Sequence, residues 1–259
     1  SKVFEFKSFC PEINIGLGVP REPIRLIASE DDRGDSHPTL RVVGTKDPSK
    51  DYTEQLSKAA DEQQQEWLGD MCGYIFKKDS PSCGVERVKY YRNGHAMRSG
   101  GVGLFAGRVI ENNPLLPVEE EGRLNDVRIK ENFVQRVYVY ARWKNLLAEG
   151  ITASGLITFH ARHKYLAMSR SQKAYKETGK ILADLSATDL DTIAQEYIQT
   201  LMRCLQKIAT RKNHVNVLQH IQGYLRENID SPDRQEIARV INCYRNEELP
   251  LIVPITLLR

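Results

Sequence analysis

The sequence contains no run of about 18 consecutive apolar residues, and its first residues lack the apolar core of a signal peptide. We therefore expect neither a transmembrane helix nor secretion, and we predict a cytoplasmic protein. Cysteine is scarce as well, because the chain has only five, an odd number at widely spaced positions. This pattern argues against a framework of disulfide bonds. In a reducing compartment, cysteines in loops more often bind metal or take part in chemistry.

Charge is unevenly divided along the 259 residues, which are enough for one large or two medium domains. Residues 1–122 carry 16 Lys and Arg against 20 Asp and Glu, whereas residues 123–259 carry 21 against 14. A basic second half favours a polyanionic partner such as nucleic acid. The alternative is that these basic helices are simply solvated.

The first half alternates between predicted strands and predicted helices. Short runs of β-branched and aromatic residues predict strands at 24–29, 40–45, 73–78 and 88–92, and the run VFEFKSF at 3–9 is strand-like. Residues 52–71 and the segment after GGVGL predict helices. This alternation favours an α/β fold, Rossmann-like, with a layered sheet that is at least partly parallel.

The second half is predicted to be all α-helical. The segment 113–126 combines prolines, three consecutive glutamates and a glycine, so we place an α/β domain at 1–115 and a helical domain at 116–259. Gly150 is the predicted end of the first long helix, and Ser231 is the predicted N-cap of the last. Apolar residues follow helical spacing at Ile129, Phe133, Val137, Tyr140, Trp143 and Leu147. Further helices are predicted at 156–168 and at about 189–208.

Two of the cysteines lie in loops that combine proline with glycine. Cys10 stands in FCPEINIGLG, after the strand-like run, and Cys83 stands in KKDSPSCG, after a predicted strand. In open α/β sheets ligands bind at the carboxyl ends of strands, so the two thiols can converge at one edge. Two thiolates suit a soft metal or an iron–sulfur site, but two ligands alone do not complete one. Two unrelated buried thiols are the alternative interpretation.

Several segments together resemble known families. CPEINIGLGVPREP and KKDSPSCG are similar to the cysteine motifs of the thiouracil desulfidase (TudS) family. PVEEEGRLND, FHARHKYLAM, NHVNVLQH and PLIVPITLL resemble a YbgA-like domain of unknown function. The fusion of the two resembles the RudS group, desulfidases of 4-thiouridine in tRNA. The resemblance covers essentially the whole chain.

The resemblance implies a [4Fe–4S] cluster held by three cysteines, and Cys10 and Cys83 match two of them. The third belongs to a motif near the family's N-terminus that this sequence does not contain. We expect either that the start of the chain is missing or that Cys72 takes its place. An iron without a protein ligand would bind the sulfur of a thiocarbonyl base, and water would replace that sulfur without net redox change.

The resemblance also implies roles for polar residues near the two thiols. Glu12 matches the family's acid and would activate water or carry a proton, with capping of a loop N–H as the alternative. Ser80 and Ser82 would orient the base or stabilise developing charge, unless they bond to their own turn. Lys77 would pair with Glu12 or hold the loop. The glycines of GGVGL would let backbone approach the substrate or form a turn before a helix.

In the RudS-like interpretation, the basic second half would bind RNA. A thionucleoside inside folded tRNA must leave its stack, at a cost of about a few kcal/mol, and phosphate contacts would offset that cost. Tyr165 and Tyr175 interleave with the basic residues, each of which could instead be merely solvated. The candidates for RNA contact are Arg162, His163, Lys164, Arg170, Lys173, Arg211, Lys212 and His214. Packing in a core is the prediction for His160, His220, Trp67, Trp143, Cys204 and Cys243.

Three hypotheses of function follow from these observations. The first is an iron–sulfur-dependent, non-redox desulfidase that converts 4-thiouridine in thiolated tRNA to uridine. The second is a desulfidase of free thiouracil or thionucleotides. The third is a non-enzymatic iron–sulfur protein that binds RNA or senses redox state. No obligate protein partner is evident from the sequence.

Overall fold

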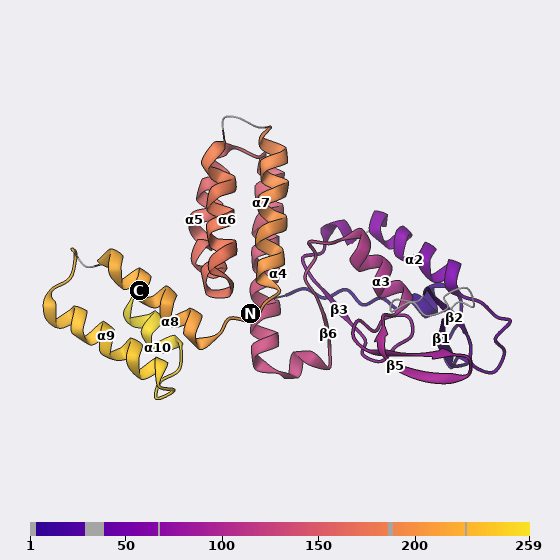
Figure 1. Cartoon of the computed structure of the whole chain (residues 1–259). Helices are drawn as coiled ribbons and strands as arrows, with labels where there is room; N and C mark the ends of the chain where they lie inside the picture. Colours follow the sequence, from indigo (N-terminus) through magenta and orange to yellow (C-terminus); the bar gives the residue numbers. More distant parts are fainter. Residues whose placement is uncertain (1–3, 29–38, 67, 186–188, 226) are drawn as a thin grey trace. The chain divides into compact units, whose positions relative to one another are not determined.

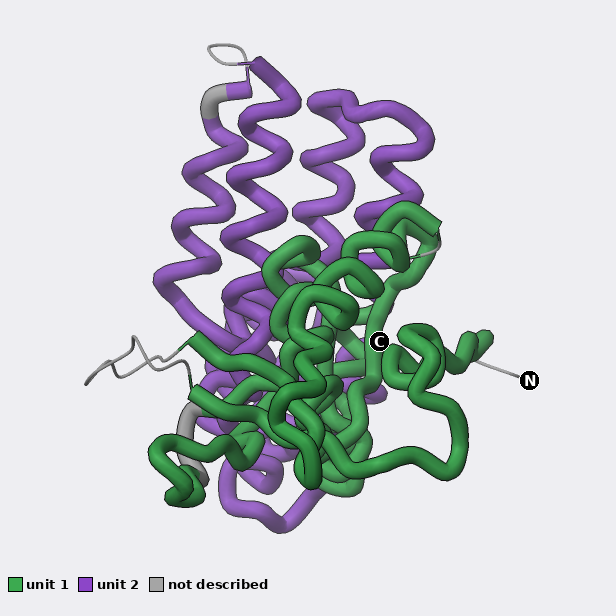
Figure 2. The backbone as a smooth tube through the Cα atoms, turned by 90° about the vertical axis from the view of Figure 1, so that its right-hand side faces the viewer, with its two compact units in different colours: residues 1–137 green, residues 138–259 purple. Residues whose placement is uncertain are grey.

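The computed structural model describes residues 4–28, 39–66, 68–185, 189–225 and 227–259. The chain divides into two compact units, residues 1–137 and residues 138–259 (Figure 2). The domain boundary predicted at residue 115 falls inside the first of these units. Trp67 and the predicted strand residues 3 and 29 lie outside the described residues.

The first unit contains a mixed four-stranded sheet in the order β2-β1-β4-β5. Strand β1 pairs antiparallel with β2 and parallel with β4, and β5 pairs antiparallel with β4. The strands are β1 (Ile24–Ala28), β2 (Leu40–Gly44), β4 (Val88–Arg92) and β5 (His95–Gly101). A separate parallel pair is formed by β3 (Tyr74–Phe76) and β6 (Val118–Glu120).

Two helices of the first unit, α2 (Thr53–Glu66) and α3 (Leu104–Asn112), lie side by side (Figure 1). Leu56 of α2 is fully buried and packs with Leu26 and Val42 of the sheet. Full burial of each such side chain contributes about 1.5–3 kcal/mol to folding. The shorter helices of this unit are α1 (Pro11–Asn14), η1 (Leu68–Asp70) and η2 (Arg123–Asn125).

The predicted α/β class of the first half is confirmed, as are its four predicted strands, its two helices and a partly parallel sheet. The strand-like run is a wrong prediction, because residues 4–9 form no strand. Strands β5 and β6 were not predicted. The first contains two glycines and few residues that favour strands, and the second contains the glutamates assigned to a boundary.

The second unit is helical. Helices α5 (Ala153–Arg170), α6 (Gln172–Ile181) and α7 (Leu190–Leu205) pack against one another (Figure 1). Helix α4 (Val127–Glu149) begins in the first unit and ends in this one. Helices α8 (Arg211–Leu225) and α9 (Ser231–Arg245) form another pair, which α10 (Ile252–Leu257) joins through α9. A short turn of 3-10 helix, η3 (Leu182–Asp184), follows α6.

Large aromatic side chains fill the interior of the second unit. Trp143 is 1% exposed and meets Phe159 edge to face, with ring centroids 5.4 Å apart. Tyr197 lies 6.4 Å from the same indole. Aromatic pairs of this geometry add about 0.5–1.5 kcal/mol to the burial of their surfaces. Within the described ranges, no helix is long and apolar enough to span a bilayer.

The predicted helical class of the second half is confirmed. Gly150 ends α4 with a φ of +90°, as its position predicted. The N-cap of α9 is Asp230 rather than Ser231, because the Asp230 carboxylate accepts the N–H of Asp233 at 2.8 Å. Helices α6, α8 and α10 were not predicted individually. Cys204 is buried as expected, whereas His160, His220 and Cys243 are only half-buried.

Candidate active site

The loop that carries Cys83 follows β3 and is shaped by Ser80. The Ser80 hydroxyl oxygen accepts the N–H groups of Ser82 at 3.3 Å and Cys83 at 3.1 Å. The Ser80 carbonyl accepts the N–H of Gly84 at 2.8 Å. A serine that bonds to its own turn in this way fixes the backbone locally. The predicted alternative, in which a serine holds its own turn, therefore holds for Ser80.

The N-terminal end of α3 supports the same loop from another side. The carbonyls of Pro81 and Ser82 accept the N–H groups of Leu104 at 3.2 Å and Ala106 at 3.0 Å. At Gly103 a side chain would collide with this loop, because a Cβ there would lie 2.6 Å from the Ser82 carbonyl oxygen. The third glycine of GGVGL therefore allows close backbone approach, and its neighbour is the cysteine loop.

The acidic run of β6 holds both ends of the cysteine loop. At the start of the loop, Glu121 accepts the Lys78 N–H at 2.7 Å and pairs with the Lys77 ammonium at 2.7 Å. At its end, the buried Glu120 accepts the N–H groups of Val85 at 2.7 Å and Glu86 at 3.0 Å. Because β6 runs parallel to β3, its end lies where that loop begins and ends.

Cys10 lies at the start of a short helix. It is the N-cap residue of α1, and Pro11 occupies the first turn. Arg21 returns to this helix from the following segment, with its Nε 2.6 Å from Glu12 Oε2 and its Nη2 3.7 Å from Cys10 Sγ. Its Nη1 donates to the Gly18 carbonyl at 3.2 Å. One guanidinium thus connects the thiol, the carboxylate and the loop.

Glu12 joins the two cysteine segments. Its Oε1 accepts the Ser82 hydroxyl at 2.5 Å, while its Oε2 pairs with Arg21. Ser80 and Ser82 share a hydrogen bond of 2.9 Å, and Ser82 reaches Cys83 Sγ at 3.7 Å. The structure therefore brings together Cys10, Glu12, Ser80, Ser82 and Cys83, which the sequence singled out.

The surroundings of the Cys83 thiol favour its neutral form. Burial raises its pKa to about 12, against the hydrogen bond from Ser82, and the charges of Glu12 and Cys10 raise it further. Burial also raises the pKa of Tyr74, and the charges of Cys83 and Cys10 raise it further. The two thiols therefore act on each other and on one tyrosine of β3. A positively charged group bound there would reverse this preference, because thiolate is the form that binds metal.

Lys77 does not reach Glu12. Its ammonium pairs with Glu121, and its side chain is 74% exposed. Of the two roles predicted for Lys77, pairing with Glu12 is wrong, since Arg21 occupies that position, and holding the loop is what the side chain does. The Lys77 side chain thus extends into solvent toward Glu121.

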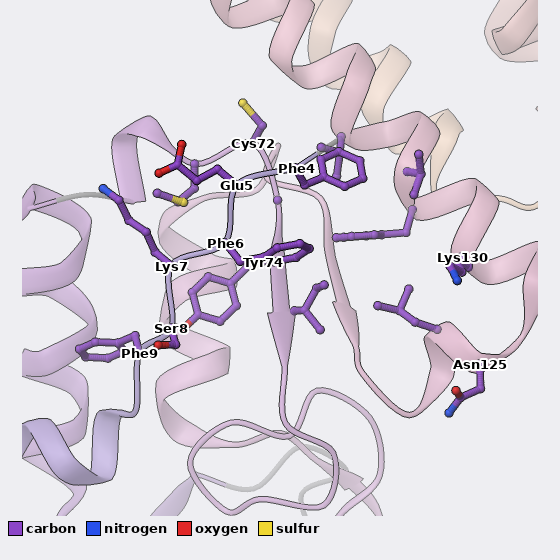
Figure 3. A pocket seen from close by; sticks show the side chains of 17 residues that line it. Phe4, Glu5, Phe6, Lys7, Ser8, Phe9, Cys72, Tyr74, Asn125 and Lys130 are labelled. Carbon is purple, nitrogen blue, oxygen red and sulfur yellow. The ribbon is translucent and has the colours of Figure 1, made fainter. Parts of the chain in front are cut away.

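Cys72 belongs to a neighbouring cavity of about 670 Å³, between residues 4–9, β3 and the start of α4. Figure 3 shows Cys72 beside Phe4 and Glu5, while the Tyr74 ring lies next to Ser8. In the part of the chain that the structure describes, no group of three or more Cys, His, Asp or Glu is arranged to hold a metal ion. Cys72 therefore does not complete a set of three ligands with Cys10 and Cys83.

The thiols at this site are the type of ligand that an iron–sulfur cluster needs, but the described ranges supply two of them here where such a cluster needs three. Two half-buried thiols lie within one polar network, as a thiophilic metal requires. A cluster with one open iron needs three thiolates, and the described residues bring two to this place. An iron–sulfur cluster at this place would therefore require a further ligand besides Cys10 and Cys83.

The basic residues predicted to bind RNA have different environments. His163 and Arg170 are 2% and 9% exposed, so neither can reach a phosphate, and we withdraw both as contacts. Arg211 donates to the Tyr244 carbonyl at 2.6 Å, and His214 Nδ1 lies 2.8 Å from the Tyr244 hydroxyl. Both side chains brace α8 against α9. The candidates that are open to solvent, fully or in part, and that do not brace these two helices are Arg162, Lys164, Lys173 and Lys212.

Sequence reasoning missed Arg21 and Glu120. Arg21 stands in the quoted motif VPREP, but arginine is not a metal ligand and so attracted no role. Glu120 lies in the run of three glutamates assigned to a boundary. Its partners Val85 and Glu86 lie 35 and 34 residues earlier in the chain, so no local signal connected Glu120 with the cysteine loop.

Two protein families match parts of this chain. Residues 1–121 match the 2-thiouracil desulfurase family, and residues 164–259 match a family described as "Protein of unknown function (DUF1722)". The site described above lies entirely within the first match. The chain is therefore a 2-thiouracil desulfurase domain fused to a DUF1722 domain, and a desulfurase domain implies an enzyme.

One curated relative matches about half of the chain. "Uncharacterized protein YbgA" of Escherichia coli (strain K12) is 33% identical over 133 residues, which are 51% of this chain and 79% of that protein. The chain belongs to the YbgA family. No solved structure matches it.

Proposed function

We propose that this protein removes the sulfur of 4-thiouridine in tRNA by hydrolysis and leaves uridine. The oxygen of water forms a bond to the ring carbon, the carbon–sulfur bond breaks, and sulfur leaves as hydrosulfide, so no electrons are transferred. The observation that supports this best is the position of Glu12 between two cysteine segments of a desulfurase domain. In such a site the carboxylate can activate water, while the thiols can hold a metal that binds sulfur.

Cys10 and Cys83 are the two residues that we propose as ligands of a [4Fe–4S] cluster, with a third thiolate from outside their network. When bound, the cluster would supply a Lewis acid suited to a sulfur atom. Arg21 lies against Cys10 Sγ and offers a donor that stabilises negative charge there, whereas the single Ser82 proton goes to Glu12.

Glu12 is the general base in this proposal. Its Oε1 takes the proton of water, and the same proton then goes to the departing sulfur or to the ring nitrogen. The Ser82 hydroxyl and the Arg21 guanidinium hold the two carboxylate oxygens, so the carboxylate orientation is fixed before substrate arrives. Ser80 supports Ser82 at 2.9 Å and keeps the cysteine loop in shape.

The second unit supplies the RNA contacts in this proposal. Arg162, Lys164, Lys173 and Lys212 are accessible cations on α5, α6 and α8. Such contacts position RNA without reading its sequence. Their energy offsets the cost of turning the thionucleoside out of its stack.

The decisive experiment uses protein reconstituted with iron and sulfide under anaerobic conditions. Thiolated tRNA is added, and the absorbance of 4-thiouridine is followed. Glu12→Gln is expected to lower kcat by about 10²- to 10⁴-fold, because general-base catalysis contributes that much. Glu22→Gln is the matched control, since Glu22 is half exposed, in the same segment, and paired only loosely with Lys50 at 3.5 Å. Wild-type turnover in Glu12→Gln would exclude Glu12 as the base.

A competition experiment separates the tRNA proposal from desulfuration of small molecules. Free 2-thiouracil and a thionucleoside monophosphate are offered together with thiolated tRNA. The proposal predicts a higher kcat/KM for tRNA. Consumption of the free base with no loss of thiouridine from tRNA would replace the proposal with the small-molecule alternative.

A further inference from the structure

Three aromatic residues and a lysine gather where α5 meets α8. The Lys164 Nζ lies 5.1 Å from the ring centroid of Tyr165 and 5.8 Å from that of Tyr224. The His220 ring lies 5.9 Å from Tyr165 and 5.4 Å from Tyr224, nearly edge to face with the first and tilted by 32° to the second. We call these four residues the aromatic–lysine cluster.

One member of the aromatic–lysine cluster is exposed to solvent, and the other three are half-buried. Tyr224 is 60% exposed, whereas Tyr165, His220 and Lys164 are half-buried. Burial raises the pKa of Tyr165 to about 12, and a hydrogen bond with Tyr224 adds to this. The two hydroxyls are therefore engaged with each other, and the Tyr224 ring, with the Lys164 ammonium over it and the His220 ring beside it, keeps most of its surface open to solvent.

We propose that the aromatic–lysine cluster is a stacking surface for an unpaired base of RNA, with Tyr224 as the stacking ring and Lys164 as the phosphate contact. This inference rests on the proposed function, in which tRNA is the substrate. An aromatic face stacks on any base, and a nearby cation meets the adjoining phosphate, which is how sequence-tolerant single-strand sites work.

The position of the cluster favours RNA over a second protein. The unit that contains it is basic, with 17 Lys and Arg against 12 Asp and Glu in residues 138–259. Lys173 and Lys212, two further accessible cations, belong to α6 and α8, which pack beside α5. A base turned out of a tRNA stack, or a neighbour exposed by that step, needs a new stacking partner, and Tyr224 offers one.

The test is RNA binding by fluorescence anisotropy at fixed salt, with labelled unmodified tRNA and a labelled short oligouridylate as probes. Tyr224→Ala is expected to weaken binding of both by about 10-fold, since stacking on one aromatic ring is worth about that factor. Tyr224→Phe keeps the ring and is expected to bind as wild type does. Lys164→Gln is expected to reduce the slope of log affinity against log salt by about 1.

Controls and outcomes separate this inference from the proposed function. Tyr138→Ala removes another exposed tyrosine, 41% exposed on α4, and is expected to leave binding unchanged. Wild-type affinity in both Tyr224→Ala and Lys164→Gln would overturn the stacking surface and leave the tRNA proposal intact. Failure of the wild-type protein to bind either RNA would overturn both. Circular dichroism of each variant establishes that the helices are unchanged.

Discussion

Both units contain short runs of candidate functional residues, the cysteine loop in the first and the basic clusters in the second. The side chains of such a run converge in the loop but diverge on a helix. In the loop, the side chains of Ser80, Ser82 and Cys83 all meet one carboxylate network. In the helices, His163 turns inward, while its neighbours Arg162 and Lys164 keep access to solvent. Consecutive residues of an α-helix point about 100° apart, so a helical cluster cannot face one ligand as a whole.

The two regions are also stabilised by different forces. Hydrogen bonds to backbone hold the loop, from Ser80 at its centre and Glu120 and Glu121 at its ends. Aromatic packing around Trp143 holds the helices. Loss of a loop bond should therefore alter chemistry more than stability, whereas loss of a core ring should do the reverse.

The largest effect is expected from replacing the thiols. Cys10→Ser and Cys83→Ser should each abolish bound iron and desulfuration, because iron–sulfur clusters are held by thiolates and serine is a poor substitute. Iron content per protein and the visible spectrum after reconstitution measure the loss. Cys243→Ser on α9, which lies outside the network, should retain both. Full iron content in Cys83→Ser would show that this thiol is not a ligand.

A large loss of stability without a change of site chemistry is expected from Trp143→Ala. Removal of a fully buried tryptophan costs about 3–5 kcal/mol, and the rings of Phe159 and Tyr197 would line the cavity. Urea unfolding followed by far-UV circular dichroism measures this loss, and Trp143→Phe should lose much less. Reactivity of the Cys83 thiol should stay at the wild-type level. A change in that reactivity would contradict the separation of the two regions.

A smaller loss, centred on the site, is expected from Glu120→Ala. The N–H groups of Val85 and Glu86 would lose their acceptor, and because both hydrogen bonds are only part-buried, each loss costs about 1 kcal/mol. The end of the cysteine loop would loosen, so Cys83 should react faster with iodoacetamide, as measured by mass spectrometry. Glu120→Gln keeps an acceptor and should react more slowly than the alanine variant. Glu111→Ala, at an exposed ion pair, is the control.

The sequence could predict elements with a clear hydrophobic pattern but not those fixed by polar contacts. The runs that became β1, β2, β3 and β4 are rich in strand-forming residues and were found from that composition. Strand β6 was missed because glutamate is uncommon in strands. Its last glutamate and the next residue, Glu121, are needed here because they accept backbone N–H groups of the cysteine loop.

The candidate site shows the same division. Motif residues next to each cysteine were found, because thiols, serines and an acid in proline-stiffened loops point to metal chemistry. Arg21 and Glu120 were missed, since their importance comes from partners 9 to 35 residues away in the chain. Such pairings depend on how the chain returns on itself, which local pattern does not encode.

The smallest expected effect concerns pH and the buried His163 of α5. Its Nδ1–H donates to the Phe159 carbonyl at 2.7 Å, and its Nε2 faces Arg142 at 3.4 Å. Burial lowers its pKa, against that backbone bond, and the charges of Arg142, Arg162 and His160 lower it further. Below about pH 6.5 the unfolded chain therefore takes up a proton that the folded chain does not.

The contribution of His163 to stability should consequently be constant above about pH 6.5 and should fall as the pH drops further, by at most about 1.4 kcal/mol per pH unit. Urea unfolding at several pH values measures the slope. His163→Gln removes the titrating ring and should flatten the slope, although His160, whose pKa burial also lowers, will leave part of it. An unchanged slope in His163→Gln would mean that this histidine takes up its proton equally in the folded and the unfolded chain. Such a result would place the His163 ring in contact with solvent rather than in the aromatic core, and His163 would again be a candidate for RNA contact.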